Sequence, residues 1–162
     1  MKLAQRLVEL AKKEVGVAEV DGTNCGPRVN IYKSATWLDP LQSWAWCAAF
    51  IDWLVMTAMD ESGEDYTFNR PRTAGAWDLE NWSLKQDNST QTKRNPGAED
   101  IEAGDIVIFK FSHVGLAIGS PVNGVVATIE GNTDSQGSRE GGGVFKKSRS
   151  INTIKTRIRF TV

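Results

Sequence analysis

The chain has 162 residues, of which 40% are hydrophobic and 24% are charged, and its formal net charge is -1. This length and composition are typical of one folded domain and exclude a disordered or fibrous protein. The small net charge argues against a dedicated nucleic-acid binder, and no apolar run is long enough to span a membrane. We therefore expect a single globular domain that is a monomer.

The N-terminal segment, residues 1–17, has the pattern of an amphipathic helix. Leu3, Leu7 and Leu10 recur at helical steps, and two lysines follow them and interrupt any continuous apolar core. A signal peptide needs such an uninterrupted core, so this segment is not expected to be one. A substrate outside the cytoplasm would then have to be reached with the help of another agent.

The next segment, residues 16–32, is rich in turn formers and in oxygen-bearing side chains, and most of it should be loop. Glu19, Asp21 and Asn24 could offer oxygen ligands to Ca²⁺, but their spacing does not match the twelve-residue calcium loop. Turn formation is the simpler interpretation, because Asp and Asn bond their own backbone in turns. We assign no metal here and expect a short helix over residues 29–37.

Residues 47–59 contain no Pro or Gly, and Cys47, Ile51, Leu54 and Ala58 recur at three- and four-residue steps. This pattern predicts a helix with Cys47 in its first turn. Unpaired backbone N–H groups and the helix dipole favour a thiolate there, and a thiolate attacks carbonyl carbons. The alternative is a structural role, since free cysteines are among the most buried residues.

The second cysteine, Cys25, could form a disulfide with Cys47. Such a bridge would consume the proposed nucleophile, and two cysteines are too few for a disulfide scaffold. We therefore expect two free thiols.

The C-terminal half changes from helical to strand patterns. Residues 73–82 predict a short amphipathic helix. Residues 83–99 are the least hydrophobic part of the chain and mark the change from helices to strands, but they are too few to separate two domains. From Gly104 the periodicity is two, which predicts antiparallel strands at residues 105–111, 113–118, 125–132, 144–147 and 154–162. The glycine-rich segment 137–143 should be a loop, and it lacks the context of a phosphate-binding loop.

The last predicted strand carries Lys155, Arg157 and Arg159 on one face. These residues could attract anionic polymers of the cell wall or outer membrane. A solvated strand face is the simpler interpretation.

The chain contains one histidine, His113, at the start of a predicted strand. A thiol nucleophile needs a neighbouring base, and a neutral imidazole suits this role near pH 7. Glu130 and Asn132 are two residues apart on a predicted strand, so both should point to the same face and either could orient the imidazole. Each signal is weak alone, but together with Cys47 they predict a cysteine hydrolase.

Four motifs resemble successive signatures of the CHAP family, the cysteine, histidine-dependent amidohydrolases/peptidases. They are Trp46-Cys47-Ala48-Ala49-Phe50, Ala103-Gly104-Asp105-Ile106, His113-Val114-Gly115 and Glu130-Gly131-Asn132. The family comprises papain-like peptidoglycan hydrolases, many of them phage endolysins. The resemblance implies an α+β, papain-like fold with N-terminal helices packed on an antiparallel β-sheet.

By the same resemblance, Cys47 is the nucleophile, His113 the base, Glu130 the orienting acid and Asn132 a supporting polar group. No cofactor is implied. Some relatives bind calcium in an acid-rich N-terminal loop, and the loop here is poorer in carboxylates, which leaves calcium open. Many relatives also carry a wall-binding module, for which this chain has no room.

The expected function is that of one catalytic CHAP-like domain, residues 1–162, that cleaves an amide bond in bacterial peptidoglycan. An endolysin-type amidase or endopeptidase would be made in the host cytoplasm without a signal peptide and would act at the cell wall. Trp44, Trp46 and Trp77 could line the substrate cleft, although burial in the core explains each nearly as well. The alternatives are an antibacterial amidase toxin, a non-catalytic wall-binding protein of the same fold, and an acyltransferase.

Overall fold

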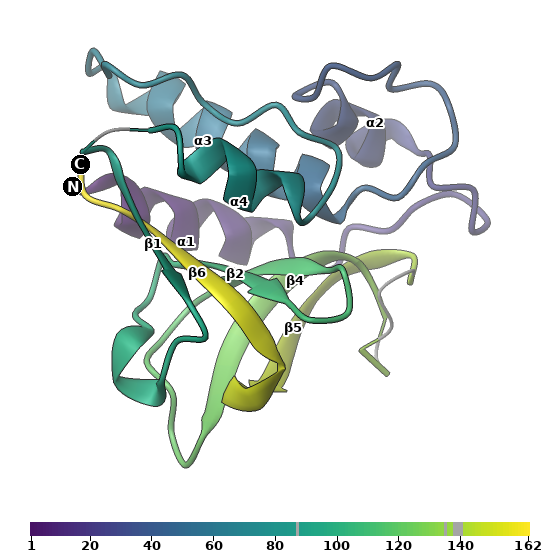
Figure 1. Cartoon of the computed structure of the whole chain (residues 1–162). Helices are drawn as coiled ribbons and strands as arrows, with labels where there is room; N and C mark the ends of the chain where they lie inside the picture. The colour runs from purple at the N-terminus through teal and green to yellow at the C-terminus, as the bar shows by residue number, and fades with distance from the viewer. Residues whose placement is uncertain (87, 135, 138–140) are drawn as a thin grey trace.

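The computed structural model describes residues 1–86, 88–134, 136–137 and 141–162. Its α-helices lie together on one side of a single β-sheet (Figure 1). The described helices are α1 (Leu3–Glu14), α2 (Pro27–Lys33), α3 (Cys47–Ser62) and α4 (Asp78–Ser83), with short 3-10 turns at Ala98–Asp100 and Ile151–Thr153. The strands are β1 (Thr90–Arg94), β2 (Ile106–Phe109), β3 (Val114–Ala117), β4 (Val125–Thr133), β5 (Gly143–Ser150) and β6 (Ile154–Phe160).

The described strands form one sheet in the order β1-β6-β2-β3-β4-β5, and all neighbouring strands are antiparallel. This arrangement confirms the expected α+β class with an antiparallel sheet. Strand β1, which pairs along β6, was not expected from the sequence and lies within residues 83–99, where the chain changes from helices to strands. Residue 87 of that segment and residues 138–140 of the predicted glycine-rich loop lie outside the described residues.

The predicted helices occur, but two of them are shorter than expected. The helix expected over residues 29–37 is α2, which ends at Lys33, and the helix expected over residues 73–82 is α4, which begins only at Asp78. The segment before α4 therefore runs in an irregular conformation across the helical layer.

Helix α3 is the central element of the core. The predicted stripe of Cys47, Ile51, Leu54 and Ala58 is buried, and so are most other residues of the first two and a half turns. This burial follows from the surroundings of α3, because α1 and α2 pack against it and strands β3 and β4 contact it from the sheet. The start of α3 is thereby fixed against the middle of the sheet.

None of the helices in the described part of the chain has the length and apolar character that a membrane span requires.

Candidate active site

Cys47 is the first residue of α3, as the sequence predicts. Its side chain is buried except for a small part, with 6% of the residue exposed, and both Cys47 and Cys25 are free thiols. The first N–H groups of a helix have no partner within the helix, so they favour negative charge at this place. The position therefore suits a nucleophilic thiolate.

His113 stands at the turn that joins β2 to β3. Ser112 has a left-handed backbone with φ of 55°, and the backbone N–H of Phe109 donates to the carbonyl of His113 at 2.9 Å, which closes the turn. The imidazole is fully buried and stacks with the rings of Phe111 and Phe109 at centroid distances of 6.0 and 5.8 Å. These contacts fix the plane of the imidazole.

One nitrogen of the imidazole is held by Glu130 on β4. Nε2 of His113 lies 2.9 Å from Oε1 of Glu130, and both side chains are fully buried. An ionised carboxylate can only accept, so Nε2 must carry the hydrogen of a neutral ring. Nδ1 then has a free lone pair, and it makes no regular hydrogen bond to any residue in the described ranges. The tautomer set by Glu130 is thus the one that can take a proton at Nδ1.

Cys47 also interacts with the imidazole of His113. Burial alone would lower the pKa of His113, but the interactions with Cys47 and then with Glu130 outweigh burial and raise it to about 9. Both interactions favour the protonated ring because a thiolate and a carboxylate are negative. The structure thus brings Cys47, His113 and Glu130 together in one buried cluster.

Two residues that the sequence analysis missed complete the surroundings of Glu130. Thr128 donates its hydroxyl to Oε2 at 2.5 Å, and Nε of Arg149 on β5 donates to the same oxygen at 2.8 Å. Nη2 of Arg149 donates a further short bond to Oε1. Burial would raise the pKa of Glu130, but the hydrogen bonds from Arg149 and His113 lower it to about 2. Glu130 is therefore an anion at any physiological pH.

Glycine at two positions allows these close approaches. Gly115 faces Glu130, and a Cβ there would lie 2.6 Å from Cγ of Glu130. Gly131 faces α3, and a Cβ there would lie 2.8 Å from both Trp46 and Phe50. Real Cβ atoms do not approach this closely, so the glycines of the two motifs have a packing reason.

Asn132 is fully buried on β4, two residues after Glu130. It has a left-handed φ of 57°, and the pairing of β4 with β5 shifts register between Glu130 and Thr133. This irregularity breaks the strict alternation from which the sequence analysis placed both side chains on one face. Nε2 of His113 bonds to Glu130.

No protein-family model matches the chain, and no curated protein sequence matches it. Its structure resembles that of an endolysin. The crystal structure of the wild-type endolysin LysIME-EF1 superposes with a TM-score of 0.58 and 17% sequence identity, over 98% of this chain and 64% of the endolysin chain. The chain therefore spans less than two thirds of that endolysin's length, and the likeness is one of fold.

The three tryptophans proposed as cleft walls occupy different environments. Trp46 is fully buried, and its indole N–H donates to Oε2 of Glu19 at 2.9 Å, so it belongs to the core. Trp44 is partly buried, and Trp77 is 46% exposed with its indole N–H on the carbonyl of Phe109 at 3.2 Å. Of the three, Trp44 and Trp77 keep surface that a substrate could contact.

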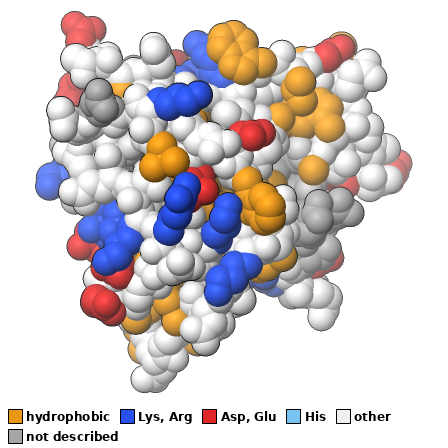
Figure 2. Space-filling model, viewed as in Figure 1, with side chains coloured by type: hydrophobic (Ala, Val, Ile, Leu, Met, Phe, Trp, Pro, Cys, Tyr) orange, Lys and Arg blue, Asp and Glu red, His pale blue; other side chains and the backbone are white. Residues whose placement is uncertain are grey.

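Trp77 borders a basic face of the molecule. Nζ of Lys155 lies 4.4 Å from the centre of the Trp77 ring, and Lys and Arg side chains gather over β1 and β6 (Figure 2). Buried Glu80 pairs with two of them, Arg94 at 2.7 Å and Lys155 at 3.3 Å. Part of this charge is therefore neutralised within the fold.

The loop considered for calcium has the conformation of a chain of turns. Asp21 and Asn24 have left-handed φ of 49° and 55°, and Oε2 of Glu19 accepts the bond from Trp46. In the described ranges, no three His, Cys, Asp or Glu side chains are grouped so that they could hold a metal ion. The turn interpretation accounts for these residues.

Proposed function

We propose that the protein is a papain-like cysteine hydrolase of the CHAP type that cleaves an amide bond in bacterial cell-wall peptidoglycan. The observation that carries this proposal is the buried cluster of Cys47, His113 and Glu130, in which the Glu130 carboxylate binds Nε2 of the imidazole. The likeness of the fold to an endolysin and the four sequence motifs support peptidoglycan as the substrate. The endolysin-type activity would be that of an amidase or an endopeptidase.

The reaction follows from the tautomer of His113. Nδ1 accepts the proton of the Cys47 thiol, and the thiolate attacks the amide carbonyl to form a tetrahedral intermediate. The imidazolium then protonates the leaving amine, and a thioester remains on Cys47. Water, deprotonated by His113, hydrolyses the thioester and restores the thiol. Glu130 stays ionised throughout and stabilises the imidazolium.

The developing oxyanion needs hydrogen-bond donors close to the sulfur. The backbone N–H of Cys47 lies in the first turn of α3, where N–H groups have no partner within the helix. It is therefore our candidate for one donor of the oxyanion hole. The Asn132 side chain is proposed as a supporting polar group.

The test is the hydrolysis of purified sacculi by Cys47→Ala, with Cys25→Ala as the matched control. Cys47→Ala should lower turnover by about 10³-fold or more, because a catalytic nucleophile is lost. Cys25→Ala should hydrolyse at the wild-type rate, and both proteins should show wild-type circular dichroism. Turnover retained by Cys47→Ala would overturn the mechanism.

Mass spectrometry of the soluble fragments from wild type identifies the bond. A new amine on the first alanine of the stem peptide indicates an amidase, and one within the stem peptide or its cross-link indicates an endopeptidase. Fragments cut only between sugars would contradict the proposed amide hydrolysis.

A further inference from the structure

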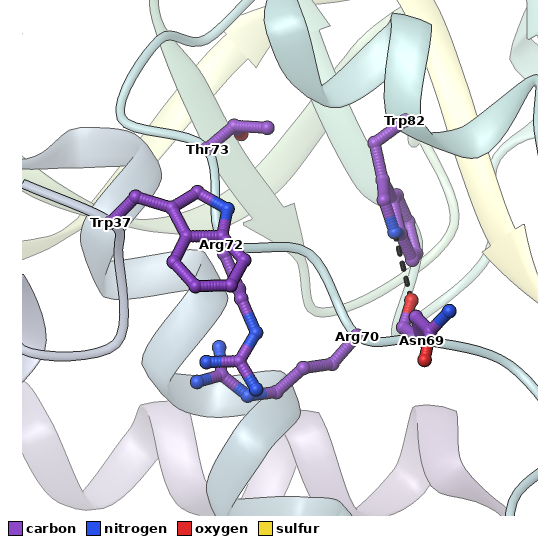
Figure 3. A pocket seen from close by; sticks show the side chains of 6 residues that line it. All are labelled: Trp37, Asn69, Arg70, Arg72, Thr73 and Trp82. Atoms are coloured by element: carbon purple, nitrogen blue, oxygen red, sulfur yellow. Dashed lines mark hydrogen bonds between the residues drawn. The ribbon is translucent and has the colours of Figure 1, made fainter.

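A pocket in the helical layer lies outside the catalytic cluster. It has a volume of about 470 Å³ and is lined by Trp37, Asn69, Arg70, Arg72, Thr73 and Trp82 (Figure 3). Two segments form most of it, the loop after α2 and the irregular segment before α4. Two hydrogen bonds tie these segments together. The backbone N–H of Trp37 donates to the Arg72 carbonyl at 3.3 Å, and Nη1 of Arg70 donates to the Ala35 carbonyl at 2.8 Å. The walls are thus fixed to one another.

Two positive charges lie next to each other in this pocket. Burial, and then the charge of Arg72, lower the pKa of Arg70, and the charges of Asp52 and Asp60 oppose this to a smaller extent. Figure 3 shows both groups below the Trp37 ring. Across the described residues, neither arginine forms an ion pair with a carboxylate, and the Arg72 side chain makes no hydrogen bond. Guanidinium groups that lack a direct carboxylate partner favour the binding of an anion.

The carboxyl group of Asp52 does not neutralise these arginines. Asp52 is fully buried on α3, and neither of its oxygens has a hydrogen-bond partner among the residues described. Burial raises the pKa of Asp52 well above its usual value, against the opposing charges of Arg70 and Arg72, and this favours the neutral acid. An electrostatic interaction with Cys47 contributes to the same rise, so Asp52 interacts with both Cys47 and the two arginines.

The remaining walls suit a small amphipathic ligand. Trp37 is 78% exposed, and the Arg72 guanidinium lies 4.7 Å from its ring centre, an arrangement that holds both groups in place. The Thr73 hydroxyl is buried and has no hydrogen-bond partner in the described part of the chain. An exposed tryptophan beside unpaired polar groups is typical of a binding surface.

We propose that this pocket binds a free carboxylate of the peptide part of peptidoglycan through Arg72 and Arg70. The inference rests on the proposed function, because that function makes the stem peptide the ligand. Stem peptides are short and acidic, and the planar fork of an arginine matches a carboxylate with two parallel bonds. The pocket therefore favours a substrate whose peptide is intact.

The experiment measures binding to the full chain with Cys47→Ala, so that the ligand is not consumed. The probes are a soluble muramoyl pentapeptide with free carboxyl groups and the same compound with those groups converted to carboxamides. Calorimetry should show that the acid form binds about tenfold more tightly, as expected for a charge-assisted bond at a partly exposed site. Adding Arg72→Gln should abolish this preference, and Arg72→Lys should retain part of it.

The matched control is Lys13→Gln, an exposed residue on α1 that removes the same charge far from the pocket in the chain. It should keep the tenfold preference, and thermal unfolding should show that all variants are folded. An equal preference in Arg72→Gln, or no preference in the parent protein, would overturn the carboxylate site.

Two further outcomes separate the possible errors. If glycerol 3-phosphate binds in an Arg72-dependent way and the muramoyl peptide does not, the pocket recognises phosphate-containing polymers and the carboxylate assignment is wrong. If Cys47→Ala still hydrolyses sacculi, the proposed function fails instead. If hydrolysis depends on Cys47 but binding of the muramoyl peptide does not depend on Arg72, only the proposal for the pocket is wrong.

Discussion

Two carboxyl groups are fully buried, Glu130 on β4 and Asp52 on α3, and their surroundings differ completely. Glu130 accepts hydrogen bonds from His113, Thr128 and Arg149. Asp52 accepts none from any described residue. Both groups have lost water to the same extent, so the comparison isolates the effect of the neighbours.

The neighbours determine the charge state of each carboxyl group. Burial raises the pKa of both, but around Glu130 the bonds from Arg149 and His113 reverse this effect and lower the pKa to about 2. Around Asp52 the arginines act only at a distance, and the pKa stays well above its usual value. A buried carboxylate is thus kept as an anion by direct donors and not by nearby charge alone.

The largest expected effect comes from removing the charge of Glu130. Glu130→Gln keeps the shape of the side chain but no longer stabilises the imidazolium, so kcat should fall by about 10²-fold or more. The pKa of His113 should fall below its value of about 9, which NMR can follow directly because the chain has one histidine. Asn132→Ala should cost less. A more damaging Asn132→Ala, with Glu130→Gln near wild type and the His113 titration unmoved, would make Asn132 the third catalytic residue.

The next largest effect is expected from removing Arg149, the hydrogen-bond donor to Glu130, while Glu130 itself is kept. Arg149→Gln leaves Glu130 buried with fewer partners, and we expect the free energy of unfolding at pH 7 to fall by about 2 kcal/mol. Urea denaturation measures this change. Lys146→Gln is the control, because it removes the same charge from an exposed neighbour on the same strand. Equal stabilities of the two variants would contradict the role given to Arg149.

The two carboxyl groups should also give opposite pH dependences of stability. The folded-state pKa of Glu130 is lowered, so its contribution is present above its ordinary pKa of 4.5 and is lost as pH falls toward about 2. The folded-state pKa of Asp52 is raised, so the folded protein binds more protons than the unfolded chain, and stability falls as pH rises above the ordinary value of 3.8. His113 adds a second alkaline loss, between its ordinary 6.5 and about 9.

The smallest effect tests the Asp52 side of the comparison. Asp52→Asn removes the titration with little change in volume, so it should be near wild type at about pH 3.5, below the ordinary pKa of 3.8, and become more stable than wild type by at least about 1 kcal/mol as pH rises to 8. The measurement is the unfolding free energy at each pH. A stability difference independent of pH, or one that shrinks as pH rises, would show that Asp52 is not held in its neutral form.

The sequence predicts the parts of this site that depend on local patterns. The start of α3 at Cys47 follows from helical periodicity and from the absence of Pro and Gly. Strand β3, which begins directly after His113, and strand β4, which carries Glu130, follow from alternation. Arg149 could not be found this way, because its reach to Glu130 depends on the register of β5 on β4. A buried glutamate in a hairpin would have been the signal to look for a cation on the partner strand.

Other features escaped the sequence for related reasons. Strand β1 has five polar residues and no apolar alternation, since it is an edge strand whose pairing with β6 supplies its structure. Asp52 breaks the stripe of α3 and is buried because elements distant in the chain cover that side. The prediction of a solvated basic face on β6 is wrong in part. Arg157 is buried, and Arg159 forms an ion pair with Asp105 at 2.8 Å.

Gly131 and Gly115 determine how closely the parts of the candidate site can approach one another. Gly131 lets β4 rest against the Trp46 and Phe50 side chains at the start of α3, and Gly115 lets Glu130 settle over β3. A methyl group at Gly131 would force β4 away from α3, and a methyl group at Gly115 would displace the Glu130 side chain. The distances within the cluster of Cys47, His113 and Glu130 therefore depend on two glycines that are not themselves members of it.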